Sequence, residues 1–211
     1  MVALSGGTTP NAMYERLATD YREIVPWHAI HFFWGDERHV PPSDAESNFG
    51  SACNAMLAKV PAPAAHVHRI HAELSDAAAA AADYEETLRR EFALDAAALP
   101  AFDLVLLGLG ADGHTASLFP GNNALRQTDR LVLAPWVPQV QGFRVTLALP
   151  VLNHASLVVF LVSGAGKAAP LHAVLDGPFQ PDRLPAQSVR PRDGRVVWLV
   201  DAAAAAHLQR R

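Results

Sequence analysis

Short apolar runs separated by polar, glycine-containing turns recur along the chain. Leu104–Leu107 has the length and aliphatic content of a strand that is buried on both faces of a parallel sheet. Similar runs predict further strands, at Met1–Ser5, Ile30–Trp34, Arg144–Leu149, Leu157–Val162 and Val196–Val200. The residues at Gly35–Pro42 and Leu131–Gln141 hold several prolines and predict loops.

Helical periodicity fills most of the intervals between these runs. Tyr84, Leu88 and Phe92 are spaced four apart after a Ser75-Asp76 cap, which predicts a helix to about Phe92. Other helices are expected after a Thr9 cap with Met13, Leu17 and Tyr21 on one face, from Ser47-Asn48 to about Leu57, after Lys167, and over Ala202–Arg211. Alternating strands and helices predict an α/β protein with a mainly parallel sheet and helices on both faces.

Length and composition narrow the class further. A chain of 211 residues predicts one domain, residues 1–211. A net charge of −4 without blocks of like charge predicts neither a nucleic-acid partner nor a membrane partner, and no apolar run approaches the roughly 20 residues of a membrane span. The single cysteine, Cys53, cannot form an internal disulfide, which with no recognisable leader predicts a cytoplasmic protein.

A glycine-rich loop follows the Leu104–Leu107 run, where an open α/β sheet binds ligands. Gly108, Gly110 and Gly113 match the spacing of a dinucleotide fingerprint, which needs a long helix starting at the third glycine. Pro120 follows too soon for such a helix, so nucleotide binding is not expected.

The same loop carries Asp112 and His114. An isolated histidine would be interpreted as a ring that only bonds a loop carbonyl. Beside an aspartate in a glycine loop at a strand end, His114 is a candidate general base, because imidazole accepts protons near neutral pH.

Three further segments offer groups for an anion. The loop from Ser5 through Gly6, Gly7 and Thr8 presents backbone N–H groups and hydroxyls, although an ordinary glycine turn would look the same. Asp36 and Arg38 end a strand, either as a solvated rim or as a site with a planar guanidinium donor. Gly166-Lys167 is not a P-loop because Ala168 replaces the magnesium-binding hydroxyl, but a lysine there can hold a sugar phosphate.

The histidines at 66, 68 and 71 resemble a metal motif only superficially. On a strand, His66 and His68 share a face whereas His71 points away, and no carboxylate or cysteine nearby completes the set. No metal site is therefore predicted from them.

Taken together, these segments resemble the 6-phosphogluconolactonase family of the glucosamine-6-phosphate isomerase/6-phosphogluconolactonase superfamily. The matching runs occur in the family's order: LSGGTTP, WGDERHVPPSDAESNFG, FDLVLLGLGADGHTASLFPG, RVTLALPVLNHA and SGAGKA. The isomerase/deaminases share the first loop and the Asp-Gly-His triplet, but the ASLFPG that follows here is that of the lactonases.

The resemblance implies a modified Rossmann-like fold and hydrolysis of 6-phospho-D-glucono-1,5-lactone in the oxidative pentose phosphate pathway, by a monomer or homodimer without metal or cofactor. It makes His114 the base, with Asp112 beside it. The other implied site residues contact the substrate or its phosphate: Ser5, Gly6, Gly7, Thr8, Asp36, Arg38, Arg144 and Lys167. The alternatives are a glucosamine-6-phosphate isomerase/deaminase and a non-catalytic sugar-phosphate sensor.

One departure from the family pattern concerns the start of the chain. Members usually have a helix and a strand before the Ser-Gly-Gly loop, whereas here the loop begins at Ser5. The resemblance therefore predicts either that Met1 is not the natural start or that the domain lacks these two elements.

Overall fold

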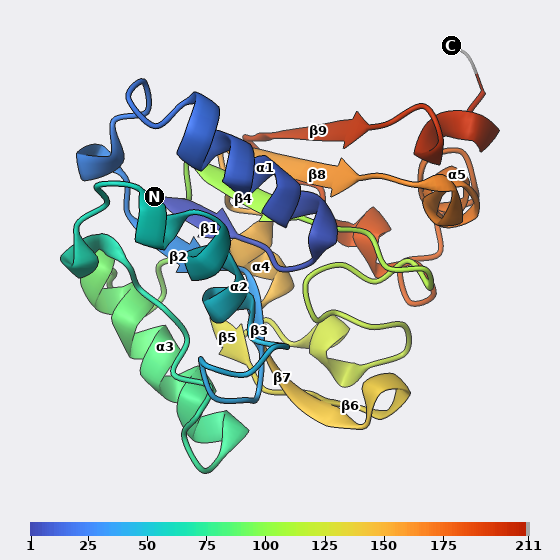
Figure 1. The fold of residues 1–211 in the computed structure, drawn as a ribbon. Helices are drawn as coiled ribbons and strands as arrows, with labels where there is room; N and C mark the ends of the chain where they lie inside the picture. The colour runs from blue at the N-terminus through green and yellow to red at the C-terminus, as the bar shows by residue number, and fades with distance from the viewer. Residues whose placement is uncertain (210–211) are drawn as a thin grey trace.

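A computed structural model describes residues 1–209. Its centre is a parallel sheet of five strands in the order β2-β1-β4-β8-β9 (Figure 1). The strands are β1 (Val2–Leu4), β2 (Phe32–Trp34), β4 (Leu104–Leu107), β8 (Leu157–Val162) and β9 (Arg195–Val200). All five strand predictions that fall in this sheet are confirmed.

A second, antiparallel sheet was not predicted. It contains β3 (Asp36–Arg38), β5 (Val132–Leu133), β6 (Trp136–Val137) and β7 (Gly142–Leu147), with β7 pairing to each of the others. The loop predictions for residues 35–42 and 131–141 were thus wrong in part. β3, β5 and β6 have only two or three residues each. They are strands because they pair with β7, and not because of an apolar pattern of their own.

Within residues 1–209, five α-helices pack around the sheets: α1 (Thr8–Asp20), α2 (Asn48–Ala55), α3 (Ala77–Glu91), α4 (Leu149–Leu152) and α5 (Ala168–Leu175). Figure 1 shows α1 crossing in front of the parallel sheet, while α3 packs against β5 and β7 of the second sheet. The protein therefore has a modified Rossmann-like α/β fold with a mainly parallel sheet flanked by helices.

The helix starts test the predicted caps. The Ser47 hydroxyl accepts from the Gly50 N–H at 3.0 Å and Asp76 accepts from the Ala78 N–H at 3.0 Å, so both caps are confirmed. The prediction of Thr9 as the cap of α1 was wrong, because the helix starts at Thr8, after Gly7 with a φ of 109°. The Thr9 hydroxyl instead shares a hydrogen bond with the Ser163 hydroxyl.

Two further helix predictions need correction. The predicted face of α1 is correct only in part: Met13 and Leu17 are partly buried against the core, but Tyr21 is 46% exposed. The buried residues of the helix are Pro10, Tyr14 and Ala18. In place of a terminal helix over residues 202–211, the described part has only a 3-10 turn at Ala204–His207, and residues 210–211 lie outside the described part. A run of alanines lacks the bulky apolar side chains that would hold a helix on the core.

Two buried tyrosines fix strand ends at the carboxyl side of the sheet. The Tyr14 hydroxyl donates to the Ser5 carbonyl at 2.9 Å and accepts from the Ser5 N–H at 3.1 Å. Tyr84 makes the same pair of bonds with the backbone of Trp34, at 3.0 and 2.8 Å. Burial raises the pKa of both phenols, so they stay neutral donors that hold β1 and β2 where the chain leaves the sheet.

The apolar core lies between the sheets and their helices and includes Trp34, Phe33, Phe102 and Phe160, all fully buried. Within residues 1–209, no helix has the length and apolar character needed to cross a membrane.

Candidate active site

A pocket of about 350 Å³ opens at the carboxyl ends of β1, β2, β4 and β8. Every strand that contributes to it ends in one of the loops singled out from the sequence. Its wall holds eight of the ten predicted site residues: Ser5, Gly6, Gly7, Thr8, Asp36, Arg38, His114 and Lys167. Asp112 and Arg144 are the two that do not line it directly.

The glycine loop after β4 forms one wall of this pocket. No helix follows Gly113 in residues 114–121, as predicted, so the loop lacks the dinucleotide-binding geometry. Gly113 has a φ of 82°, and a Cβ on Gly110 would lie 2.1 Å from Nδ1 of His114. These glycines allow the loop to fold the histidine back over its own backbone.

His114 and Asp112 form a close pair in this loop. Nδ1 of His114 lies 2.6 Å from Oδ1 of Asp112, which also accepts the His114 backbone N–H at 3.1 Å. The Phe119 ring stacks on the imidazole at 4.0 Å between centroids. Because a carboxylate only accepts hydrogen bonds, Nδ1 carries the proton and Nε2 presents a lone pair. Nε2 has no hydrogen-bond partner among residues 1–209, which leaves it free to accept a proton.

Asp36 and Arg38 form the opposite wall, on the same face of β3. The Ser117 hydroxyl donates to Asp36 at 2.6 Å, and Arg38 donates to the Asn48 side-chain oxygen at 2.7 Å and to the Glu46 carbonyl. Asn48 in turn donates to the Asp36 carbonyl at 2.9 Å. This network holds the guanidinium in place without neutralising it.

Glu37 lies on the other face of β3 and is 2% exposed. Its carboxylate accepts from the backbone N–H groups of Asn48 at 2.6 Å and Phe49 at 2.8 Å and from the Ser47 hydroxyl at 3.1 Å. Burial raises the pKa of Glu37 above its ordinary value, against the opposing effect of the backbone N–H groups of Phe49, Asn48 and Arg38. This carboxylate joins β3 to the start of α2.

We expect Glu37→Ala to destabilise the fold, because it leaves buried amides of α2 without acceptors. At roughly 1–3 kcal/mol for each buried donor left unpaired, the free energy of unfolding should fall by about 2–4 kcal/mol. Glu86→Ala, which removes an exposed carboxylate of α3, is the control and should shift it by less than about 0.5 kcal/mol. Urea unfolding measures both, and equal stability of the two variants would contradict this role for Glu37.

Arg144 lies directly across from Arg38, because β7 pairs with β3 in that register. Its guanidinium bonds only the Phe143 carbonyl, at 3.1 Å, within the described chain. Burial and the neighbouring Arg38 lower the pKa of Arg144 below its ordinary value. Two like charges facing each other are unfavourable unless an anion lies beside them, so this pair of arginines favours anion binding at the pocket edge.

Lys167 and Ser5 complete the polar lining. The Lys167 ammonium crosses the pocket to donate to the Leu109 carbonyl of the glycine loop at 2.7 Å. The Ser5 hydroxyl oxygen is buried and has no hydrogen-bond partner in the described part of the chain. A buried hydroxyl without a partner is costly, so a ligand oxygen there would satisfy it.

Two contributors to the site were missed by sequence reasoning. Asn48 was interpreted only as a helix cap, but a Cβ on Gly6 would lie 1.7 Å from its Oδ1, so it separates Gly6 from Arg38. Ser117, which bonds Asp36, lies 81 positions further along the chain. The one sequence signal for Asn48 and Ser117 was that both lie in the runs that resemble the family.

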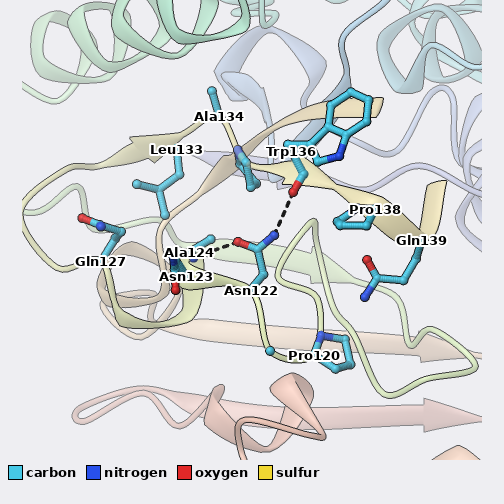
Figure 2. A pocket seen from close by; sticks show the side chains of 12 residues that line it. Pro120, Asn122, Asn123, Ala124, Gln127, Leu133, Ala134, Trp136, Pro138 and Gln139 are labelled. Atoms are coloured by element: carbon cyan, nitrogen blue, oxygen red, sulfur yellow. Dashed lines mark hydrogen bonds between the residues drawn. The ribbon is translucent and has the colours of Figure 1, made fainter. Parts of the chain in front are cut away.

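A larger hollow, of about 520 Å³, lies elsewhere, over residues 120–124 and 133–139. Figure 2 shows its wall, where the Asn122 amide donates to the Trp136 carbonyl at 3.0 Å. It is lined by proline, amide and apolar side chains and contains no titratable group. The smaller pocket at the strand ends is therefore the candidate active site.

The fold and this pocket define an α/β protein with a pocket of polar and cationic side chains at the carboxyl edge of a parallel sheet. The family model described as "Glucosamine-6-phosphate isomerases/6-phosphogluconolactonase" matches residues 1–198, and the chain belongs to this family.

Individual relatives support this assignment. A protein of Synechocystis sp. named 6-phosphogluconolactonase is 43% identical over 209 residues, which are 99% of this chain and 84% of the relative. The solved structure of 6-phosphogluconolactonase from Trypanosoma brucei superposes with a TM-score of 0.87 at 31% identity, covering 99% of this chain and 86% of that one. The solved structure named devB protein gives a TM-score of 0.92 at 36% identity, covering 99% and 87%.

Proposed function

We propose that the protein hydrolyses 6-phospho-D-glucono-1,5-lactone to 6-phospho-D-gluconate, as a carboxylic ester hydrolase of the oxidative pentose phosphate pathway. The observation that carries the proposal is the Asp112–His114 pair, at 2.6 Å, in a pocket that Arg38 and Lys167 also line. Catalysed hydrolysis of a phosphorylated lactone needs a base, a water molecule and side chains that hold the phosphate. Relatives named 6-phosphogluconolactonase at 43% and 41% identity support the choice of this substrate.

In the proposed reaction, Nε2 of His114 accepts a proton from water as the water oxygen bonds to the lactone carbonyl carbon. The carbonyl oxygen becomes an oxyanion, and its collapse breaks the bond from that carbon to the ring oxygen. The imidazolium then gives its proton to the ring oxygen, which leaves as a hydroxyl. Asp112 holds Nδ1 and stabilises the charged ring, so it positions the base through the 2.6 Å contact.

Cationic and neutral donors bind the substrate's oxygens in this proposal. Arg38, Arg144 and Lys167 hold phosphate or lactone oxygens as charge-assisted donors. The Ser5 hydroxyl, the backbone of Gly6 and Gly7, and Thr8 at the start of α1 add neutral donors at a helix N-terminus. Asp36, fixed by Ser117 at 2.6 Å, accepts from a sugar hydroxyl.

The surroundings of the reaction are part of the same proposal. The ligand is a small sugar-phosphate lactone rather than nucleic acid, and the reaction as written uses side chains and water alone. The free Cys53 agrees with a reducing, cytoplasmic compartment. A monomer or a homodimer, and one domain over the whole chain, stay predictions.

The test of the function is a choice of substrates. Freshly generated 6-phosphogluconolactone and glucosamine 6-phosphate are offered separately, and acid release and ammonia release are followed with spontaneous hydrolysis subtracted. The proposal expects acid release from the lactone and no ammonia. Ammonia release would assign the isomerase/deaminase activity, and binding of either compound without turnover would assign a sugar-phosphate sensor.

Replacing Lys167 tests the anion side of the pocket. Lys167→Ala removes a charge-assisted contact worth roughly 1.5–3 kcal/mol, so KM should rise about 10–150-fold with a small change in kcat. Lys59→Ala, the other lysine of the chain and outside the pocket, should leave both constants unchanged. A fall in kcat with an unchanged KM would move Lys167 from binding to the chemical step.

A further inference from the structure

A cluster of metal-ligating side chains lies at the amino end of β2, opposite the carboxyl ends where the pocket opens. His31 directly precedes β2, His68 directly follows a residue that bridges to β2, and Glu91 ends α3. One ligand atom from each of the three lies within 4.8 Å of the others. Nδ1 of His31 is 2.9 Å from Nε2 of His68, which is 3.8 Å from Oε2 of Glu91.

Hydrogen bonding inside the protein does not satisfy this cluster. The two imidazoles share one hydrogen bond, so one of the facing nitrogens is a donor and the other presents a lone pair. The Glu91 oxygen adds a second acceptor, at a distance too long for a hydrogen bond. The single proton shared by the two rings therefore leaves this oxygen without a partner in the cluster.

The rings around the cluster add to the case. His66 stacks on His31 at 3.9 Å between centroids, and among the described residues its buried Nδ1 has no hydrogen-bond partner. Phe33 stacks on His68 at 4.5 Å.

We propose that His31, His68 and Glu91 form a structural Zn²⁺ site. Two imidazoles and a carboxylate are a donor set that zinc accepts, with a water as fourth ligand. With Zn–N bonds of roughly 2.0–2.1 Å, tetrahedral ligand nitrogens lie about 3.3 Å apart, so the two rings need to separate by only a few tenths of an ångström. Each ring binds as the neutral tautomer that carries its proton on the nitrogen facing away from the ion.

The second oxygen of Glu91 is already held in place. Nε of Arg90 donates to Oε1 at 2.9 Å, which leaves Oε2 directed at His68. Such outer contacts orient metal-binding carboxylates. A hollow of about 480 Å³ that His68, Thr87 and Arg90 help to line gives an ion a route to the cluster.

The position of the site predicts what the ion does. It joins β2, the segment at His68 and the end of α3, three parts of the chain that are far apart in sequence. Asp36 of the pocket lies five residues beyond His31, roughly 16 Å at the rise of a strand. Zinc at this edge therefore stabilises the fold and takes no part in the reaction.

The experiment titrates Zn²⁺ into protein that has been stripped with a chelator and dialysed, by calorimetry and thermal unfolding. One zinc should bind at this site, and zinc at about 100 times its dissociation constant should raise Tm by roughly 5–10 °C. Glu91→Gln and His31→Gln should each weaken zinc binding at least about tenfold, since each removes one ligand. Mg²⁺, which prefers oxygen ligands, should give no shift.

Two control variants test whether the histidine–aspartate pairs elsewhere in the chain contribute to zinc binding. His71→Gln breaks the pair of His71 with Asp83, 2.7 Å apart, and His114→Asn breaks that of His114 with Asp112. Both should keep the zinc-dependent rise in Tm. If the parent binds no zinc, or if Glu91→Gln binds it as tightly as the parent, the proposal is wrong. Glu91 ends a helix and is 22% exposed, so its variant decides the question even if His31→Gln does not fold.

Discussion

His114→Asn is expected to lower kcat for 6-phosphogluconolactone by about 10²–10⁴, the usual contribution of a general base. The amide cannot accept a proton from water at the place where Nε2 of His114 lies. Because asparagine still fits beside Asp112 and Gly110, KM should change little. Initial rates over a range of lactone concentrations measure both constants once spontaneous hydrolysis is subtracted.

A matched control for this variant exists outside the pocket. His71 and Asp83 form another histidine–carboxylate pair, with 2.7 Å between ring nitrogen and oxygen. His71→Asn should leave kcat and KM at parent values. If His114→Asn keeps near-parent kcat, the base is another group, and Asp36 in the opposite wall is the next candidate.

The second large effect concerns the phosphate. Gluconolactone without phosphate should react with a kcat/KM about 10²–10⁶ lower than that of the phosphorylated lactone, since two or three charge-assisted contacts of roughly 1.5–3 kcal/mol are lost. Arg38 and Arg144, which face each other across β3 and β7, supply the physical reason, because the phosphate would add negative charge beside two like charges.

A double comparison makes this test specific. In Lys167→Ala, the phosphorylated lactone loses one of its contacts and the neutral lactone loses none, so the ratio of the two kcat/KM values should shrink. Equal kcat/KM for the two lactones in the parent protein would show that the cationic side chains do not recognise phosphate.

The parallel sheet was predictable because each of its strands carries its own signal. β4 and β8 are continuous aliphatic runs, and β8 was predicted with its observed bounds of Leu157–Val162. β3 has no such signal: Asp36, Glu37 and Arg38 are charged, and only pairing with β7 makes them a strand. Strand propensity is judged from one segment at a time, so it misses a strand that forms only because another strand pairs with it.

The site was predictable to the extent that its residues occupy strand ends. Eight of the ten predicted residues meet in one pocket because the carboxyl ends of parallel strands lie at one edge. The spacing of residues in the sequence does not predict contacts between distant segments. It did not indicate that Asn48 separates Gly6 from Arg38. Nor did it indicate that His68 lies beside His31 and Glu91 rather than grouping with its sequence neighbours His66 and His71.

The histidines at 66, 68 and 71, from which no metal site was predicted, show the same limit. His66 ends a 3-10 turn at Ala64–His66, and His71 bonds Asp83, so these three do not gather around one point. The strand assumed for them was wrong, because only Val67 bridges to β2. The ligand set proposed here is assembled by tertiary packing, which explains why no local motif announces it.

Hydrolysis of a phosphorylated lactone in this pocket, with His114 as the base, is tested by acid release from freshly generated 6-phosphogluconolactone. The parent and His114→Asn are compared side by side, at equal protein concentration, against a protein-free blank. We expect turnover well above the blank for the parent and a rate lower by about 10²–10⁴ for the variant. Parent activity equal to the blank, or equal rates for the two proteins, would contradict it.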